Sequence, residues 1–237
     1  MIPILKKNEP WPEPFPEDGF VVLIEKPEGW TSFDVVNKIR RSLRIKKVGH
    51  AGTLDPFATG LLIVGVGKGT KQMERFSGLQ KRYLAQIHLG VQTETYDVTG
   101  RIVQERPVGF LDENRVRQVL ESMLGEQMQI PPMYSAKKVN GVPLYKLARK
   151  GRVVERKAVP VTIYEARLLR FEPPFVTVDL LVSKGTYIRS FAHDFGERLG
   201  TGGHLKTLQR TQIGPYRLEE SFAIEMFVDL WKTKVNG

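Results

Sequence analysis

The sequence predicts an α+β fold built around a mixed sheet. The order of the predicted elements leads to this class, and the length and apolar content of the chain show that it can fold. Segments with strand patterns and segments with helix patterns are interspersed, but they do not alternate as the β-α-β units of a doubly wound fold do. The chain has 237 residues, 41% of them apolar, which is enough to bury one substantial core and rules out intrinsic disorder as the main state. No internal repeat is present.

The N-terminal part of the chain gives the clearest elements. Residues 20–25 form a β-branched run that predicts a strand, and Lys26-Pro27-Glu28-Gly29 predicts the turn that ends it. Thr31, followed by Asp34, resembles a capping box, so we expect a helix over residues 32–44. The apolar positions of that helix recur at helical spacing: Phe33, Val36, Ile39 and Leu43.

The rest of the chain predicts further strands and helices. After a loop at residues 48–59, residues 61–66 and 83–89 have strand patterns. Asp112 is placed to cap a helix, and residues 175–183 give the clearest strand. A last long helix follows and is expected to stop at Gly200. The apolar face of this last helix comprises Ile188, Phe191, Phe195 and Leu199. The apolar face of the helix after Asp112 comprises Val116, Val119, Leu120, Met123 and Leu124.

Composition narrows the classes of function. The chain has no cysteine, which excludes disulfides, thiolate nucleophiles and zinc-cysteine or iron-sulfur clusters. No apolar run reaches the roughly 18 residues that a membrane-spanning helix needs, and the N-terminus is broken by prolines and acids where a signal peptide would be apolar. We therefore expect a cytoplasmic protein. The net charge of +10 makes polyanions the expected partners, nucleic acid before anionic membrane.

The positive charge is concentrated in two clusters. Residues 137–157 hold eight basic side chains against one acid, Glu155. A second cluster, at residues 40–47, leads into a glycine-rich stretch. Charge runs of this kind are often only solvated faces, but here glycines and aromatics are interleaved with the cations, as an RNA surface requires. The basic residues are Lys137, Lys138, Lys146, Arg149, Lys150, Arg152, Arg156 and Lys157, and Arg40, Arg41, Arg44, Lys46 and Lys47.

Several familiar sites are excluded by spacing. The run at residues 60–70 lacks the lysine directly after its second glycine that a Walker phosphate loop requires, because Val66 follows Gly65. No G-x-S-x-G hydrolase motif occurs. The four histidines show no metal-binding spacing, so no metal site is expected, and we interpret His193 and His204 as structural.

The loop at residues 48–60 is the best candidate for chemistry. It is dense in glycine and carries one histidine, His50, and one aspartate, Asp55, which precedes Pro56. An aspartate before a proline commonly does no more than initiate a turn, by bonding to its own backbone. At its ordinary pKa of about 3.9 the carboxyl would be ionised at neutral pH, which suits a presented carboxylate.

The wider pattern G-H-x-G-x-L-D-P-x-A-T-G resembles the catalytic-loop signature of the TruB family, the bacterial tRNA pseudouridine synthases that modify uridine 55. The resemblance extends to residues 26–36, 81–83, 183–190 and 205–216. It implies a pseudouridine-synthase-type fold, with a mixed, largely antiparallel sheet flanked by helices and a basic insertion at about residues 131–157. It also implies a catalytic domain over residues 19–216, between a proline-rich segment at 1–18 and a short tail at 217–237. Bacterial members usually continue into an RNA-binding PUA domain, and we expect no full one here.

The resemblance also implies roles for individual residues. Asp55 would be the nucleophile, Arg189 the arginine that pairs with its carboxylate, and Tyr83 the tyrosine that stacks on the target base and could transfer a proton. His50 would help to displace the T-loop bases when the uridine is extruded. The expected substrate-binding residues are His50, Lys71, Leu208, Lys26 and Tyr187.

The expected reaction is an isomerisation that needs no cofactor. Whether the carboxylate attacks C1′, adds to the pyrimidine ring or promotes glycal formation stays open. The implied partner is the T stem-loop of tRNA, with no membrane, no obligate protein partner and a monomeric state. Two alternatives stay open: an RNA-binding or tRNA-folding protein whose catalysis is dispensable or lost, and a guide-dependent enzyme of the dyskerin type.

Overall fold

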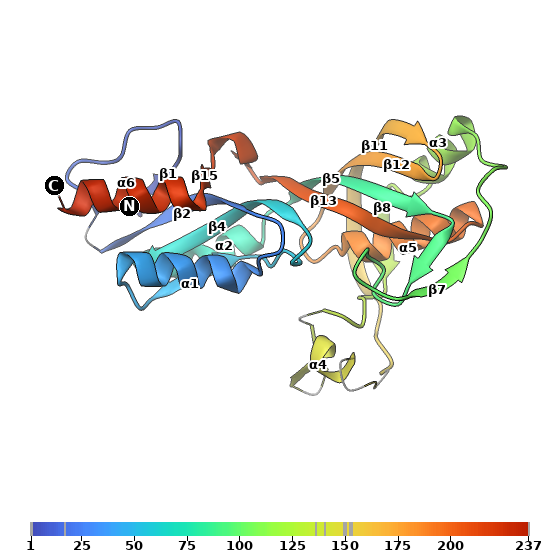
Figure 1. Ribbon diagram of the computed structural model, residues 1–237, viewed down its shortest axis with the longest axis horizontal. Coiled ribbons are helices and arrows are strands. Elements are labelled where there is room, and N and C mark those ends of the chain that lie inside the picture. The colour runs from blue at the N-terminus through green and yellow to red at the C-terminus, as the bar shows by residue number, and fades with distance from the viewer. Residues whose placement is uncertain are drawn as a thin grey trace. The chain divides into compact units, whose positions relative to one another are not determined.

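The structure is a computed structural model that describes residues 2–16, 18–135, 137–139, 141–148, 151 and 154–236 (Figure 1). Internal contacts divide it into two compact units. The first contains residues 1–83 and 209–237, and the second contains residues 84–208. The chain leaves the first unit within strand β5 (Lys81–Leu89) and returns to it within strand β13 (Gly203–Ile213).

The first unit is centred on two antiparallel strands, β2 (Gly19–Lys26) and β4 (Thr59–Gly67), which pair from Gly19 opposite Gly67 to Lys26 opposite Gly60. The order of strands is β1-β2-β4-β13, with β13 parallel to β4. Short strands complete this part of the sheet: β1 (Ile4–Leu5) and β15 (Phe222–Ala223) beside β2, β3 (Val48–Ala51) beside β4, and β14 (Tyr216–Arg217) beside β13.

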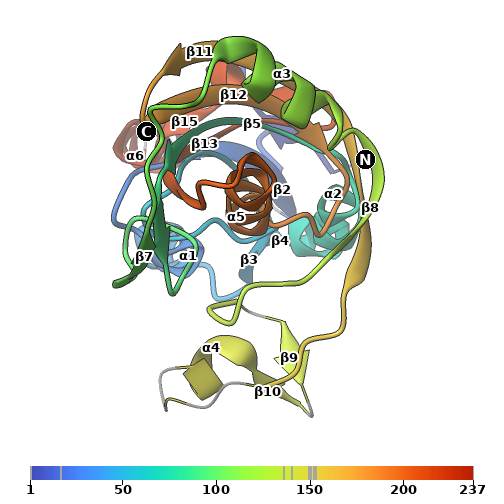
Figure 2. The same ribbon diagram turned by 90° about the vertical axis from the view of Figure 1, so that its right-hand side faces the viewer.

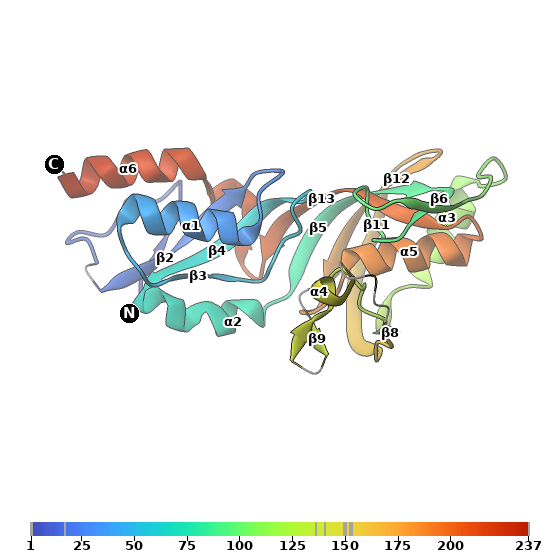
Figure 3. The same ribbon diagram turned by 60° about the horizontal axis from the view of Figure 1, so that its bottom comes forward.

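Helices cover both faces of this sheet. Helices α1 (Ser32–Leu43) and α6 (Ile224–Asn236) lie on one face, and α2 (Met73–Ser77), which follows the 3-10 helix η1 (Lys68–Gln72), lies on the other (Figure 3). Alternate residues of β2 enter the two cores, Val22 with α1 and α6 and Val21 with α2. Because successive side chains of a strand point to opposite faces, a strand covered on both sides reads as a continuous apolar run.

The two ends of the chain pack together in the first unit. Trp11 and Phe15, from the proline-rich N-terminal segment, lie against the core that α6 contributes. The Phe15 ring meets that of Trp231 at 5.2 Å between centroids, and Trp11 meets Phe227 at 5.9 Å. Residues 218–236, which include the 3-10 helix η2 (Leu218–Glu220), are therefore an ordered part of this unit.

The second unit has the strand order β13-β5-β12-β11-β8. Strand β11 (Val159–Glu172) pairs antiparallel with both β12 (Phe175–Val182) and β8 (Gly125–Gln129), and its register with β12 shifts twice, which bends the sheet. Helix α5 (Ile188–Leu199) lies on the concave side of these strands (Figure 2). Helix α3 (Glu113–Glu121) and the hairpin of β6 (Val91–Thr93) and β7 (Ile102–Glu105) complete the unit.

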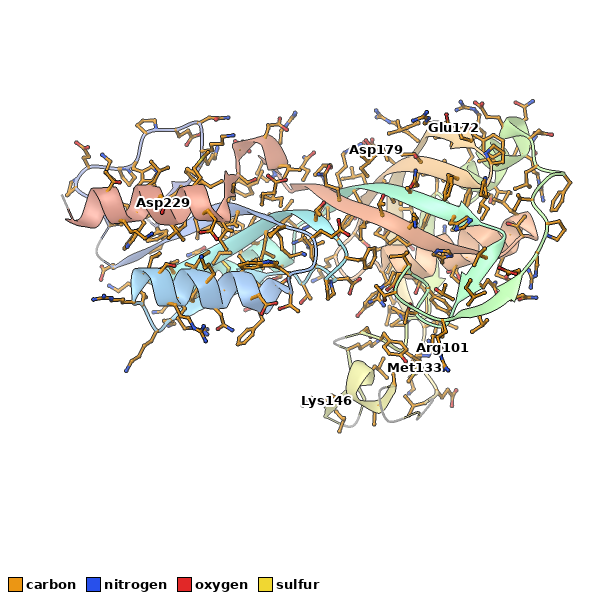
Figure 4. All side chains as sticks on the ribbon, viewed as in Figure 1. Arg101, Met133, Lys146, Glu172, Asp179 and Asp229 are labelled. Carbon is orange, nitrogen blue, oxygen red and sulfur yellow. The ribbon has the colours of Figure 1, made fainter. Side chains whose placement is uncertain are left out.

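The basic insertion contains β9 (Lys138–Val139), β10 (Val142–Pro143) and α4 (Leu144–Ala148) (Figure 2). Its two ends are joined where Nη1 of Arg156 donates to the carbonyl of Pro131 at 3.1 Å. Figure 4 marks Lys146 on α4, where it is exposed. Three other cations of this cluster lie outside the described residues: Arg149, Lys150 and Arg152.

The predicted fold class is confirmed: α+β, with a mixed, largely antiparallel sheet, flanking helices and a basic insertion. The box at Thr31 is confirmed in both directions, and α5 ends at Gly200, whose φ of 81° is left-handed. Two details differ. The loop expected at residues 48–59 begins as strand β3, because it pairs with β4. Leu124 is 43% exposed, because α3 ends at Glu121. Throughout the described part of the chain, the helices are too short and too polar to cross a lipid bilayer.

Candidate active site

Asp55 lies in the first unit, on the loop between β3 and β4. Its side chain is half-exposed, while its neighbour Leu54 is only 3% exposed and sits in the core. The carbonyl of Asp55 accepts from the amide of Ala58 at 3.1 Å, which closes a tight turn through Pro56. The loop therefore turns back into β4 with its carboxylate at the tip.

The residues on both sides of Asp55 are fixed by groups from other elements. The amide of Leu54 donates to the hydroxyl of Ser32, at the start of α1, at 2.9 Å. On the other side, the carbonyl of Pro56 accepts from the amide of Gly29 at 2.8 Å and from Nζ of Lys26 at 3.3 Å. The backbone that carries the carboxylate is thus held before and after it, which is the preorganisation that a reacting group needs.

Arg210, from β13, supports the earlier part of the same loop. Its side chain is 1% exposed. Nη2 donates to the carbonyl of Gly52 at 3.1 Å, Nη1 approaches the carbonyl of Thr53 at 3.5 Å, and Nε donates to the carbonyl of Leu61 in β4 at 2.8 Å. One guanidinium therefore joins the loop to the strand that follows it.

Lys26 is the second buried cation beneath the loop. Its ammonium donates to the carbonyls of Trp30 at 2.6 Å, Pro27 at 2.8 Å and Pro56 at 3.3 Å. Burial lowers the pKa of Lys26 to about 8, against the negative charge of Asp55, which raises it. The substrate-binding role that we expected for Lys26 stays a prediction, and the hydrogen bonds described here are all to main-chain carbonyls.

The other candidates of the first unit differ in exposure. His50 lies on β3, and its buried Nδ1 has no hydrogen-bond partner among the residues that the structure describes. Burial, aided by the charge of Arg210, lowers its pKa. Tyr83 is 8% exposed on β5. Lys71 is exposed on η1. The structure thus gathers Asp55, His50 and Lys26 around one loop, and the substrate roles of all five stay predictions.

Arg189 is the centre of a polar cluster in the second unit. It lies on the first turn of α5 and is 4% exposed. Its Nη1 is 3.4 Å from a carboxylate oxygen of Asp97 and 3.3 Å from the carbonyl of Thr95, and its Nη2 donates to the carbonyl of Tyr134 at 2.8 Å. Asp97 also accepts from the hydroxyls of Thr95 and Thr99 at 2.7 and 2.5 Å. The pairing of Arg189 with the carboxylate of Asp55 stays a prediction.

Tyr187 and Leu208 also belong to this second unit. The amide of Tyr187 donates to Oε1 of the buried Gln129 at 2.8 Å, and its carbonyl accepts from Nε2 of Gln129 at 3.1 Å. This bidentate contact fixes the backbone at the start of α5, while the ring of Tyr187 is half-exposed. Leu208 is 7% exposed on β13. Within the described residues, no group of three acids or histidines could hold a metal ion.

Four residues of these clusters were missed in the sequence: Ser32, Arg210, Asp97 and Gln129. The run Thr93–Gly100 did carry a signal for Asp97, because threonines and an aspartate crowded before a glycine indicate a polar turn with internal hydrogen bonds. Ser32 followed a helix cap and was interpreted only as part of the helix. Arg210 and Gln129 lie far along the chain from the backbones that they hold, and no local pattern marked them.

The sequence matches the TruB family pseudouridylate synthase N-terminal domain over residues 40–188, and the tRNA pseudouridylate synthase B C-terminal domain over residues 189–237. It is 47% identical over 213 residues to "tRNA pseudouridine synthase B" of Geobacter sulfurreducens, covering 90% of this chain and 70% of that protein. It is 46% identical to the protein of the same name from Chlorobaculum tepidum, covering 90% of this chain and 91% of that protein.

Solved structures give the same fold. A Cbf5-Nop10-Gar1 complex contains a chain that superposes with a TM-score of 0.73 at 28% identity, over 96% of this chain and 60% of the other. An H/ACA RNP bound to a substrate RNA containing 2′-deoxyuridine gives a TM-score of 0.69 at 28% identity, over 91% of this chain. This chain spans only 54% of that second chain.

The sheet, the anchored carboxylate loop and these matches define a pseudouridine synthase. More narrowly, the chain belongs to the TruB family of pseudouridylate synthases. The division into a catalytic domain at 19–216 and a tail at 217–237 stays a prediction.

Proposed function

We propose that this protein isomerises uridine to pseudouridine in tRNA, at U55 of the T loop, with Asp55 as the nucleophile. The observation that carries the proposal is the loop of the first unit, where groups of other elements hold the backbone at Leu54 and Pro56, on either side of the half-exposed Asp55. The relatives are named tRNA pseudouridine synthase B, which supports tRNA as the substrate. The net charge of +10 suits a polyanion.

The reaction breaks the N1–C1′ bond of uridine and forms a C5–C1′ bond after the base has turned. C5 loses a proton and N1 gains one, so the product is an isomer of the substrate and no oxidant is needed. In this proposal the Asp55 carboxylate reacts with the nucleotide and produces an intermediate in which the base can detach from C1′. Attack at C1′, addition to the ring and glycal formation are all compatible with a carboxylate at the tip of a rigid loop.

The other residues act around this step. Arg189 orients the carboxylate and keeps it ionised, Tyr83 stacks on the base, and His50 helps to displace the T-loop bases. Leu208 and Tyr187 wall the base pocket, and Lys71 contacts phosphate. Lys26 supports the loop, because its buried ammonium donates to the carbonyl of Pro56.

The cations of the insertion bind the RNA backbone in this proposal. Phosphate contacts give affinity and register without reading sequence, so they complement a loop that acts on one uridine. The exposed side chain of Lys146 on α4 suits such a contact.

The test uses the purified full chain and one unmodified tRNA transcript, with no guide RNA and no second protein. We expect pseudouridine to form at position 55 and nowhere else in the transcript. A matched transcript with cytidine at position 55 should gain no pseudouridine. Modification of another uridine would replace the proposed target, and turnover only in the presence of an added guide RNA would favour the guide-dependent class.

A second readout tests the substrate in the cell. Pseudouridine is mapped in total RNA from cells with and without the protein. Loss confined to position 55 of tRNAs supports the proposal, whereas intact tRNA together with losses in another RNA contradicts it.

A further inference from the structure

The buried guanidinium of Arg210 holds the loop that carries Asp55, but it has no part in the proposed reaction so far. Burying a cation costs several kcal/mol of solvation, and a well-packed apolar side chain would often stabilise a core as well. Arg210 is 1% exposed, with all three of its nitrogen donors directed at main-chain carbonyls. Two of those carbonyls belong to Gly52 and Thr53, on the loop that presents Asp55.

The position of the guanidinium is fixed from the opposite side as well. Arg210 pairs with Gly60 across β13 and β4, and a Cβ on Gly60 would lie 2.4 Å from the carbonyl oxygen of Arg210. No side chain larger than hydrogen fits there, so the two backbones are held in close contact. The bond from Nε to Leu61 then aims the planar fork of the guanidinium back at the loop.

The loop also lies in contact with the guanidinium. Gly52 has a φ of +87°, in the left-handed region, and a Cβ there would lie 3.7 Å from Nη1 of Arg210. This conformation turns the carbonyl of Gly52 onto Nη2, at 3.1 Å. Burial is the main cause of the lowered pKa of His50 and of Lys26, and the positive charge of Arg210 lowers both further.

We propose that Arg210 is a positioning residue for the reaction: through the carbonyls of Gly52 and Thr53, it sets the conformation of the loop that carries Asp55. A planar fork with several fixed donors can hold two carbonyls at once, which a lysine cannot. The effect belongs to catalysis and not to RNA binding, because the guanidinium is buried. This inference rests on the proposed function of Asp55.

The test compares Arg210→Lys with the wild-type chain. The variant keeps the charge and loses the fork. We expect kcat to fall by about ten- to a hundredfold, as for a displacement of reacting groups by about 1 Å, while the KM for tRNA changes less than threefold. Amide hydrogen exchange of residues 52–55 should become faster in the variant without any RNA present.

A control and a second variant keep the test decisive. Arg198→Lys changes an exposed arginine that donates to the carbonyl of Ser122 at 3.1 Å, and it should leave kcat within twofold of wild type. Gly52→Ala strains the left-handed turn while Arg210 stays in place, so it should also lower kcat with little change in KM. This variant applies even where Arg210→Lys does not fold.

The outcomes separate the two proposals. An inactive wild-type chain would refute the proposed function, whereas the exchange of residues 52–55 would still report on the support that Arg210 gives. Wild-type turnover in Arg210→Lys or in Gly52→Ala would overturn the inference and leave the function of Asp55 standing. A rise in KM with kcat unchanged would also overturn it.

Discussion

Ser32 and Leu54 are bonded in both directions: the amide of Leu54 donates to Oγ of Ser32 at 2.9 Å, and that hydroxyl is 3.3 Å from the carbonyl of Leu54. Ser32 opens α1, and its side chain is 2% exposed. The residue before Asp55 is thereby fixed to a helix whose own start is set by the capping box of Thr31. The first turn of α1 thus supports the candidate active site.

Ser32→Ala should lower both stability and turnover. Removing the hydroxyl leaves a buried amide without its partner, which costs about 1–3 kcal/mol of unfolding free energy. Because the freed backbone adjoins Asp55, we expect kcat to fall by about tenfold. Urea unfolding and turnover of a tRNA transcript measure the two effects.

Thr31→Ala is the matched control. It removes the neighbouring cap, at a cost of about 1 kcal/mol, without touching the loop. It should lose stability and keep its kcat. Equal losses of turnover in both variants would mean that Ser32 acts only through the stability of α1.

Asp97→Asn should strongly destabilise the second unit. Asp97 and Arg189 are both nearly fully buried, and the carboxylate also accepts from Thr95 and Thr99. Removing one charge of a buried pair costs about 3–5 kcal/mol, because the other charge loses its compensation. Glu94→Gln breaks an exposed pair with Arg101 and should leave the urea midpoint unchanged. A loss below about 1 kcal/mol in Asp97→Asn would show that other groups compensate the charge of Arg189.

Asp194 gives the protein a measurable pH dependence. Burial raises the pKa of its carboxyl to about 6, partly offset by Arg198. Because the folded pKa is above the unfolded value, the stabilisation present at low pH is lost as the pH rises through about 6. Asp194→Asn should therefore unfold at a higher temperature than wild type at pH 7.5, and the difference should vanish near pH 4.

The difference between the two chains is the quantity to measure, because the histidines act in the opposite direction. Burial lowers the pKa of His50, His88, His193 and His204, so their contribution to stability is present above about pH 6.5 and is lost as the pH falls. Asp229→Asn, on the exposed face of α6 (Figure 4), is the control without burial. Equal shifts at pH 7.5 and pH 4 would contradict the account of Asp194.

The insertion should hold RNA by electrostatics. Neutralising Lys137, Lys146 and Lys157 to glutamine should flatten the slope of log affinity against log salt by roughly 2 to 3, at about 0.7 to 0.9 per phosphate contact. The control neutralises three lysines that already pair with acids: Lys38, Lys232 and Lys234. A slope as steep as that of the wild type would show that the insertion is a solvated face.

The sequence predicted the elements whose patterns are local. The Thr31 box and the stop at Gly200 depend on residues within one turn of each other, so they could be predicted from spacing. Strand β3 was missed because its four residues lead directly into a loop dense in glycine and form a strand only by pairing with β4. Strand β13 was not predicted as a strand: residues 205–216 were matched only by resemblance, and buried and exposed positions do not alternate regularly along β13.

The candidate site likewise has one part that could be predicted from the sequence and one part that could not. The loop around Asp55 could be recognised because its residues are consecutive. The groups that hold it come from α1, from the turn after β2 and from β13, which only the fold brings together. These groups donate to main-chain carbonyls or, at Ser32, accept from a main-chain amide, and such contacts do not depend on the side chains of the loop that they support.

The most direct test of the account is the turnover of Asp55→Asn. Asparagine has nearly the same size but cannot act as the nucleophile, while RNA binding depends on many phosphate contacts. A purified Asp55→Asn chain should form no pseudouridine at position 55 of the tRNA transcript and should bind that transcript within about tenfold of the wild-type affinity. Substantial turnover by the variant would show that Asp55 is not the nucleophile.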